Sequence, residues 1–480
     1  MTAESFVVRN ADVDGRRADV RIRNGVVDCI DTVVNAARGE TVVDAEGGAL
    51  LPGLHDHHIH LIALAAARGS LDLAAVTPTP SSGADQRLGD RLVAAHRALP
   101  ADSWLRVVGY HESMEPDLDR WWLDRFVPDR PVRVQHRSGR QWILNSRALE
   151  LCAVGTLSGD TVETDSSGVP TGRITGLDDV LGRRWSGSGD LDSLIEDASA
   201  ELAAYGVTGL TDATPYSAAD DLGPLLSGLR SRRIVQRLTV TCAPSLVLHE
   251  AMVQPAEIGP AKVIVADHLP MSIEGVVAQI ELARGQNRCV AIHCVTRVGL
   301  IVCLAAFDEI GARNGDRIEH GAVVDADLAA RLAEHGLVVV TQPNFVFERG
   351  DRYLADVDPD DRDHLYPCGS LRSAGVRVGG STDAPFGHPD PWRAMRSAVD
   401  RRTSSGQAIG EHERISPAEA LALFLTPPNR PGSSTRRVVV GAGADLCLLD
   451  RSQDRALLEL TAGSVRRTWV GGRLVFANDR

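Results

Sequence analysis

Two histidines separated by one residue, His58 and His60, follow an apolar segment of the kind found in buried strands. Because residues i and i+2 of a strand point to the same face, both imidazoles can reach one metal ion. Three further polar residues, His55, Asp56 and His57, precede the pair in the segment HDHHIH. The spacing indicates metal binding, although a lone HxH pair is also compatible with two core histidines.

Three more potential ligands follow apolar segments later in the chain. His293 ends VAIH, His320 ends RIEH, and Asp383 follows VGGST. If these segments are parallel strands of one barrel, their carboxyl ends meet on one face, where the active sites of such barrels form. Each histidine alone could be a satisfied core residue. The ordered set favours a metal-dependent active site.

Lys262 is the only lysine among the 51 lysines and arginines. It lies in PAKVIVA, an apolar, β-branched run typical of a buried strand. A buried lysine is costly unless its amine is paired or bound to a metal. Arginine cannot replace a lysine that has to become neutral and react. Two interpretations stay open at this point: a strand-end lysine that reaches solvent, and a position that requires an amine.

The composition excludes several classes of protein. The 480 residues are 43% hydrophobic and 24% charged, which is ordinary for a soluble globular chain. The net charge of −13 argues against binding to nucleic acid or to an anionic membrane. The eight cysteines form no CxxC pair, and the first residues show no signal-peptide pattern. We therefore expect a cytoplasmic protein with reduced thiols.

Alternating strand and helix patterns predict the fold that positions these residues. After GGALLPGLHDHHIH, seven further buried strands are predicted, with helical segments between most of them. Eight such β/α units predict a (β/α)₈ TIM barrel. The predicted strands are Val207–Asp212, Arg237–Cys242, Lys262–Ala266, Cys289–His293, Asp316–His320, Leu337–Gln342 and Val376–Thr382.

Two regions fall outside this alternation. Both termini show short strands broken by turns, which predicts a composite β-sandwich domain from residues 1–52 and 432–480, flanking a barrel from 53 to 431. The first and second barrel strands are separated by far more residues than a plain β/α connection needs. We therefore predict an insertion subdomain at about 65–195.

Ten segments of the chain resemble the amidohydrolase superfamily of metal-dependent hydrolases, within it the amidohydrolase-3 or YtcJ-like branch. The similarity runs from about Leu50 to the C-terminus, and its order is specific. The segments are ALLPGLHDHHIHL, QWILNSRAL, DSSGVPTGRITG, GVTGLTDAT, AIHCVT, RIEHGA, TQPNF, GGSTDAPFGHPDPW, ISPAEALALF and GADLCLLD.

The resemblance implies a centre with two metal ions, most simply zinc, although other divalent metals fit the same ligands. One ion would be held by His58, His60 and Asp383, and a second by two further histidines. Lys262 would be carboxylated and would bridge both ions as a carbamate, which only a neutral amine can form. The second pair of ligands consists of His293 and His320.

The resemblance also implies an activity. A water activated by the metals would attack a carbonyl, and Asp383 would take its proton and pass it to the leaving group. We expect hydrolysis of a C–N bond in a small amide, such as an N-substituted formamide or another N-acyl amine. A cyclic amidase, a deaminase and an esterase or lactonase stay open as alternatives. A non-catalytic scaffold subunit is disfavoured because every ligand position is filled, and a metal-storage module because the site looks built around an organic ligand.

Substrate recognition is predicted from the insertion and from one barrel strand. The segment VQHRSGRQWILNSRAL resembles a motif of the branch in which Arg140 usually is histidine. His136 and Arg140 could bind an anionic group, Trp142 could form an apolar wall, and Gln342 could contact substrate. An exposed basic loop, a tryptophan in the core of the insertion and a capped strand end are the plainer interpretations. His55 and His268 could support a metal ligand or contact the carbonyl oxygen of a substrate, but solvated loop residues are the plainer interpretation for both. The partners expected are a small-molecule substrate and, from the family, a second copy of the chain.

Overall fold

The computed structural model describes residues 5–73, 84–100, 103–137, 139, 141–152, 162–175, 191–265 and 272–478, without the side chains of 84–86. The chain divides into two compact units, Met1–Leu61 with Ser199–Arg480, and Ile62–Ala198. The first unit contains the barrel and the terminal sheets. The second unit is the insertion after the first barrel strand.

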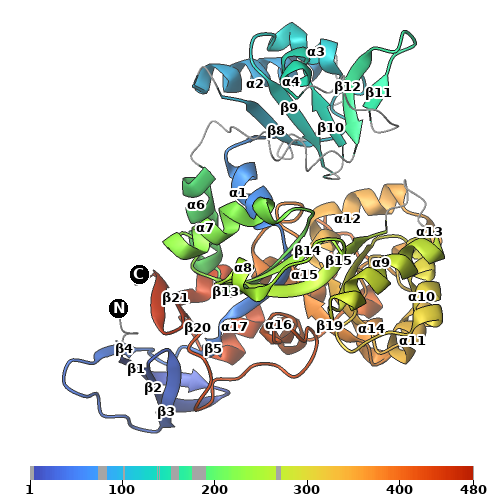
Figure 1. Cartoon of the computed structure of the whole chain (residues 1–480). Helices are drawn as coiled ribbons and strands as arrows, with labels where there is room; N and C mark the ends of the chain where they lie inside the picture. Colours follow the sequence, from blue (N-terminus) through green and yellow to red (C-terminus); the bar gives the residue numbers. More distant parts are fainter. Residues whose placement is uncertain are drawn as a thin grey trace. The chain divides into compact units, whose positions relative to one another are not determined.

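The first unit is built on one parallel sheet of eight strands, which confirms the predicted (β/α)₈ class (Figure 1). Most residues of these strands are buried, as expected for parallel strands that are covered on both faces. The sheet has the order β19-β18-β17-β16-β15-β14-β13-β6. Its strands are β6 (Leu54–Ile59), β13 (Val207–Tyr216), β14 (Arg237–Cys242), β15 (Glu257–Ile264), β16 (Val290–Cys294), β17 (Arg317–His320), β18 (Val338–Thr341) and β19 (Arg377–Gly380).

Helices connect these strands, and several begin at residues that cap them. The side chain of Thr296 accepts a hydrogen bond from the Gly299 N–H at the start of α10, and Ser416 forms a capping box with Glu419 at the start of α16. The α-helices are α1 (Leu61–Arg68), α6 (Leu191–Ala204), α7 (Gly223–Ser231), α8 (Glu250–Val253), α9 (Ile273–Gly285), α10 (Arg297–Ile310), α11 (Ala326–Glu334), α12 (Asn344–Asp356), α13 (Pro359–Arg362), α14 (Gly369–Ser373), α15 (Pro391–Asp400), α16 (Pro417–Leu425) and α17 (Gln453–Glu459).

Strand β15 differs most from its predicted limits. It begins at Glu257, five residues before Lys262, instead of at Lys262 itself. Gly259 and Pro260 lie inside this strand, where the ladder between β14 and β15 shifts register, between the pairs Val240–Ile258 and Cys242–Ala261. A bulge accommodates a proline inside a strand. As a result, Lys262 lies in the last third of its strand, toward the carboxyl end.

Backbone hydrogen bonds close the barrel between β6 and the segment after β19. The Asp383 N–H donates to the His58 carbonyl over 2.9 Å, and the His60 N–H donates to the Ala384 carbonyl over 2.9 Å. These two bonds place the end of the last strand beside the end of the first. Two residues that are 325 positions apart, His58 and Asp383, are therefore neighbours because of the closure itself.

Two four-stranded sheets from the termini share one hydrophobic core, which includes Val8, Leu448 and Trp469. Asn24 and Gly25 have φ of 53° and 76° and form the tight turn of a hairpin, as the Asn-Gly pair predicts. The sheets are β3-β2-β1-β4 and β22-β21-β20-β5. Their strands are β1 (Phe6–Val13), β2 (Arg16–Arg23), β3 (Val26–Asp31), β4 (Thr41–Asp44), β5 (Leu50–Pro52), β20 (Leu446–Leu449), β21 (Val465–Val470) and β22 (Arg473–Ala477).

The insertion has a six-stranded sheet of its own, in the order β11-β12-β10-β9-β8-β7. Its helices α2 and α3 pack on this sheet through a core that includes Leu92, Trp122 and Val134. The elements are β7 (Leu71–Asp72), α2 (Ala84–Ala98), β8 (Leu105–Tyr110), α3 (Arg120–Phe126), β9 (Val132–His136), β10 (Gln141–Leu144), α4 (Ser146–Leu151), β11 (Val162–Thr164) and β12 (Pro170–Thr175).

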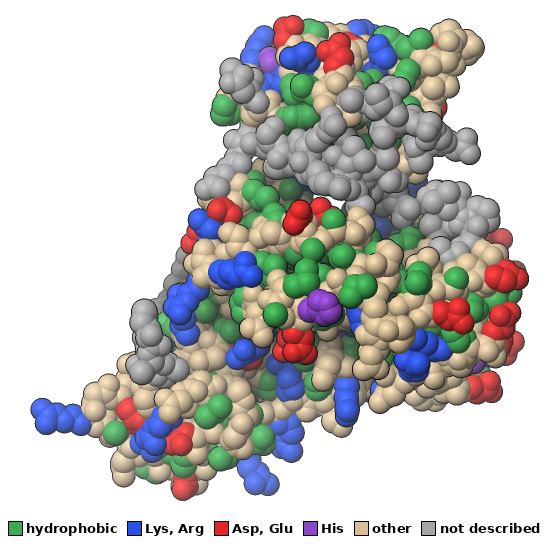
Figure 2. All heavy atoms as spheres, viewed as in Figure 1, with side chains coloured by type: hydrophobic (Ala, Val, Ile, Leu, Met, Phe, Trp, Pro, Cys, Tyr) green, Lys and Arg blue, Asp and Glu red, His purple; other side chains and the backbone are tan. Residues whose placement is uncertain are grey.

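The surface shows acidic and basic side chains interspersed on the face of the first unit that Figure 2 presents. All eight cysteines are free thiols. Among the described residues, no helix combines the length and the apolar character that a membrane crossing requires.

Candidate metal centre

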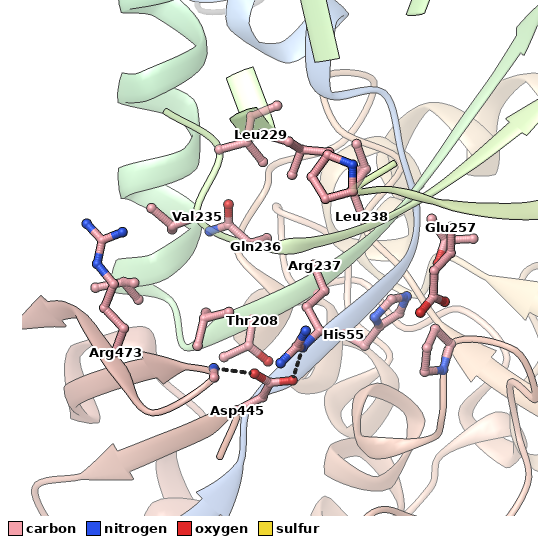
Figure 3. Close-up of a pocket in the computed structure, with 18 of the residues that line it drawn as sticks. His55, Thr208, Leu229, Val235, Gln236, Arg237, Leu238, Glu257, Asp445 and Arg473 are labelled. Carbon is pink, nitrogen blue, oxygen red and sulfur yellow. Dashed lines mark hydrogen bonds and ion pairs between the residues drawn. The ribbon is translucent and has the colours of Figure 1, made fainter. Parts of the chain in front are cut away.

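A cavity of about 540 Å³ lies in the first unit, at the amino-terminal ends of the barrel strands (Figure 3). Its lining includes His55, Thr208, Arg237 and Glu257, which stand at or near the first residues of β6, β13, β14 and β15. The Nε of Arg237 donates to Asp445 over 2.5 Å at its edge. Active sites of (β/α)₈ barrels form at the opposite, carboxyl-terminal ends of the strands, so we looked there for the chemistry.

Strand β6 separates its polar residues between two faces. Successive side chains of a strand point to opposite sides, so His58 and His60 share one face and His55 and His57 share the other. His55 contacts the Thr211 hydroxyl over 2.9 Å, and His57 contacts the Thr426 hydroxyl over 2.8 Å. Both are buried. The interpretation of His55 as a solvated loop residue is therefore wrong, because it lies inside a barrel strand.

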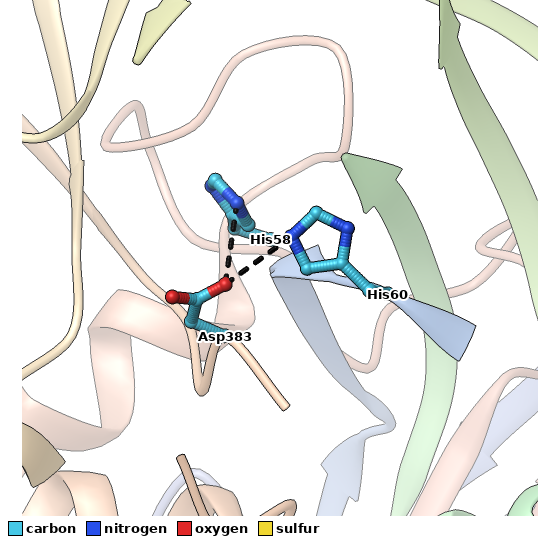
Figure 4. A group of neighbouring side chains, drawn as sticks. All are labelled: His58, His60 and Asp383. Atoms are coloured by element: carbon cyan, nitrogen blue, oxygen red, sulfur yellow. Dashed lines mark ion pairs between the residues drawn. The ribbon is translucent and has the colours of Figure 1, made fainter. Parts of the chain in front are cut away.

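His58 and His60 face the carboxylate of Asp383 (Figure 4). The Nε2 atoms of the two histidines lie 3.5 and 3.3 Å from the same oxygen, Oδ1 of Asp383. Each of the three residues offers a ligand atom within the 4.8 Å span of a single site. The backbone of Asp383 has a positive φ of 56°, an uncommon conformation that is typical of functional sites.

The other nitrogen of each of these two rings has a fixed partner. Nδ1 of His58 meets the buried Glu319 carboxylate, and Nδ1 of His60 meets the Thr214 hydroxyl over 2.9 Å. Arg317 holds Glu319 in turn, with its Nε 2.6 Å from Oε1. A proton on each Nδ1 would leave the Nε2 lone pairs directed at Asp383. This is the arrangement in which metal-binding histidines are usually held.

His293 and His320 lie together beside this group. The Nε2 of His320 is 2.8 Å from the Nδ1 of His293, and the rings of His320 and His58 are 4.8 Å apart between centroids. The Nδ1 of His320 lies 2.8 Å from the amide oxygen of Gln342. The amide nitrogen of Gln342 donates to Ser381 over 2.9 Å. Gln342, predicted to contact substrate, is fully buried and orients His320.

Lys262 joins the same cluster from β15. Only 3% of its surface is exposed, and its Nζ lies 3.4 Å from the Nε2 of His58. Burial lowers the pKa of Lys262 to about 8, against the opposing effect of Glu319 and Asp383. An amine with this pKa is partly neutral near physiological pH, which an ordinary lysine is not.

The charges of the cluster favour a cation. Burial lowers the pKa of His58 to about 3 and also lowers the pKa of His293 and His320, so these imidazoles are neutral lone-pair donors at neutral pH. Burial would raise the pKa of Asp383, but the nearby histidines outweigh it and hold this pKa below its usual range. The cluster thus presents neutral nitrogens and an ionised carboxylate.

One atom shows that these residues fit a metal ion. Oδ1 of Asp383 is buried and makes no hydrogen bond with any described residue. Leaving a buried carboxylate oxygen without a partner is costly. A divalent cation between this oxygen and the Nε2 atoms of His58 and His60 would satisfy all three, because carboxylate oxygen and imidazole nitrogen are common ligands of such ions.

The predicted residues of the insertion lie in the other unit. Trp142 is 5% exposed and packs with Trp104 in a core cluster of the insertion. His136 ends β9 and contacts Glu112 over 3.2 Å. Arg140 lies outside the described residues, and so does His268.

Sequence reasoning missed the residues that hold the ligands in place. Glu319 stands immediately before His320, and Asp56 stands two residues before His58. Asp56 accepts hydrogen bonds from the N–H groups of His58 and Thr382, and burial raises its pKa to about 7. The available signal for both was an acidic residue inside a buried strand, within two residues of a histidine ligand.

An eight-stranded parallel barrel with His, His and Asp at its strand ends defines the class of metal-dependent hydrolases. The chain belongs to the amidohydrolase family, whose model matches residues 41–476.

Individual proteins agree with this assignment. The chain is 27% identical to an N-substituted formamide deformylase of Arthrobacter pascens, over 92% of this chain and 90% of that protein. It is 25% identical to the putative amidohydrolase YtcJ of Bacillus subtilis (strain 168), over 90% of both. Its fold is similar to that of an uncharacterized metal-dependent hydrolase of Pyrococcus horikoshii, with a TM-score of 0.74, 19% identity and coverage of 96% of this chain and 100% of that one.

Proposed function

We propose that this protein hydrolyses the C–N bond of an amide in a small organic substrate and depends on divalent metal for it. The observation that carries the proposal is the placement of Asp383 Oδ1, which is buried and faces two Nε2 atoms at 3.3 and 3.5 Å. The similarity to an N-substituted formamide deformylase supports an amide, and specifically an N-formyl or N-acyl amine, as the substrate class.

The proposed metal ligands are the six residues of the cluster. His58, His60 and Asp383 are proposed for one ion, and His293 with His320 for a second, with Lys262 shared between them. Bound zinc would supply a water of lowered pKa and an electrophile for the carbonyl oxygen. Zinc is the first choice because imidazole nitrogen and carboxylate-type oxygen both suit it.

Lys262 is proposed to act as a carbamate. Its neutral amine would form an N–C bond to CO₂ and release one proton, which converts a neutral group into an anion suited to bind metal ions. The pKa of about 8 supports this step, since a fraction of the amine is neutral at physiological pH. Its burial favours the product as a metal-bound group over a free ammonium.

Asp383 is proposed as the proton carrier. As the water oxygen attacks the carbonyl carbon, the carboxylate accepts the proton that this water loses. It then returns the proton to the amide nitrogen as the C–N bond breaks, so that a carboxylic acid and an amine leave. The lowered pKa of Asp383 keeps it ionised and ready to accept at neutral pH. The closure bond from its N–H to the His58 carbonyl holds it in position.

A hydrolysis screen tests the proposal. Protein loaded with zinc and bicarbonate is assayed against matched panels of N-formyl amines, N-acyl amines, cyclic amides and esters. We expect turnover of acyclic amides, loss of that turnover in Asp383→Asn, and loss of both metal and turnover in Lys262→Arg. Hydrolysis of esters without hydrolysis of any amide would contradict the proposed reaction. Full activity in Lys262→Arg would contradict the carbamate.

A further inference from the structure

A second group of metal-binding side chains lies in the insertion. His111 and Glu112 follow directly after β8, and His136 ends β9. The Nε2 atoms of His111 and His136 lie 3.1 and 3.2 Å from one atom, Oε2 of Glu112. Among the described residues, this group and the barrel group are the two in which three such ligand atoms meet within 4.8 Å.

The backbone fixes the three residues relative to one another. Strands β8 and β9 are parallel neighbours, with Tyr110 paired to His136, and they lie side by side in the insertion (Figure 1). The Arg137 N–H donates to the Tyr110 carbonyl over 2.8 Å. The Tyr110 hydroxyl donates to the Glu115 carbonyl over 2.7 Å, which holds the loop that carries His111 and Glu112. The imidazoles therefore converge because the two strand ends do.

The exposure of the three side chains suits an ion that arrives from solvent. The rings of His111 and His136 are each 15% exposed, whereas the Glu112 side chain is 52% exposed. The ring centroids are 5.6 Å apart. Two imidazoles held mostly by protein and a carboxylate open on one side leave room for water to complete the coordination of an ion.

We propose that His111, Glu112 and His136 form a binding site for a divalent transition-metal ion, with none of these ligands belonging to the barrel cluster. Two imidazole nitrogens and one carboxylate oxygen are the ligand set of many sites that keep open positions for water, and zinc binds such sets well. A bound ion would link the end of β8 to the end of β9 and hold the loop after β8 in place.

Binding requires one exchange of hydrogen bonds. The Nδ1 of His111 lies 2.9 Å from the Ser113 hydroxyl and accepts a hydrogen bond from the Ser113 N–H at 3.1 Å. When Nε2 holds an ion, Nδ1 must carry the proton and donate it to the hydroxyl, while the contact with the N–H is lost. We therefore expect this site to bind zinc more weakly than the catalytic centre.

Counting bound ions tests the site without reference to activity. Zn²⁺ is titrated into metal-free, full-length protein against a chromophoric chelator, and Co²⁺ is titrated in parallel and followed by its visible absorption. The variants are Glu112→Gln, His111→Gln with His136→Gln, and, as a matched control, His249→Gln at an exposed position outside the insertion. Near-UV circular dichroism of the metal-free forms checks that each variant is folded.

We expect the histidine double variant to bind one equivalent of zinc fewer than the unmodified protein with strong or moderate affinity. In Glu112→Gln we expect the zinc affinity of this site to fall at least about tenfold. His249→Gln should match the unmodified protein. Equal stoichiometry and affinity in all variants would overturn the proposal, and so would an equal loss in His249→Gln. If the double variant is misfolded, the Glu112→Gln variant still tests the site, because this side chain is 52% exposed and its replacement should not disturb the fold.

Discussion

The two histidine pairs in and directly after β6, His55 with His57 and His58 with His60, share a residue type but differ in what their nitrogens face. His55 and His57 each place Nε2 against a threonine hydroxyl, and both side chains are buried. His58 and His60 instead place Nε2 against an ionised carboxylate, while Nδ1 has a fixed partner. The face of the strand and the partner of the second nitrogen therefore distinguish a candidate ligand from a structural histidine.

The largest difference is expected when one histidine on each face of the strand is replaced. His58→Asn is expected to lower metal affinity by more than roughly 100-fold, because a first ligand matters at least as much as the residues that support it. Amide hydrolysis should disappear with the metal. His57→Asn should retain metal and activity and lose about 1–3 kcal/mol of unfolding free energy through its buried hydrogen bond. Metal analysis measures the bound metal, and urea unfolding measures the free energy of unfolding. Equal metal loss in the two variants would contradict the assignment of His57 and His58 to different faces of the strand.

The threonines that support the two faces offer a finer test. Thr214→Val removes the partner of the His60 Nδ1 and should weaken metal binding by roughly tenfold. Thr426→Val removes the partner of the His57 Nε2 and should leave metal affinity unchanged, at a cost of about 1 kcal/mol in stability. Chelator competition gives the affinities. Identical zinc affinities in the two variants would show that the His60 contact does not support a ligand.

Glu40, which directly precedes β4, supplies the smallest expected effect and a reference outside the barrel strands. Glu40 accepts hydrogen bonds from Ser5, Ala37 and Arg21, of which the bond from Ser5 contributes most to lowering its pKa to about 2. Because its pKa is lower in the folded state than in the unfolded state, the Glu40 carboxylate stabilises the protein at pH values above its unfolded-state pKa. This stabilisation is lost as the pH falls toward its folded-state pKa. Glu40→Gln should therefore destabilise by roughly 1 kcal/mol near pH 6, with the difference from the unmodified protein vanishing near pH 2. A difference that is constant over this range would rule out the charge of Glu40 as its cause.

Much of the fold could be predicted because its signals are local. The buried, β-branched strands alternate with helices, and the adjacent residues Asn24 and Gly25 are enough to predict a hairpin turn. The start of β15 could not be predicted, because whether Gly259-Pro260 ends a strand or forms a bulge depends on the neighbouring strand. Local pattern does not contain that information.

The candidate ligands could be predicted from strand ends, but their supports could not. Barrel topology makes the ends of parallel strands converge, so His58 and His320 could be grouped from sequence. Glu319 supports a histidine 261 positions away in the chain, and only the folded barrel shows that contact. The sequence left two interpretations open for Trp142, a pocket wall and a core residue of the insertion, because both have the same sequence pattern; the side chain packs in a core cluster of the insertion.

We propose that a metal ion lies between His58, His60 and Asp383. Anomalous X-ray diffraction at the zinc edge, on crystals of zinc-loaded protein, would locate this ion. We expect a strong anomalous peak bonded to Nε2 of His58, Nε2 of His60 and Oδ1 of Asp383. Zinc-loaded crystals with no peak among these three atoms would contradict this proposal.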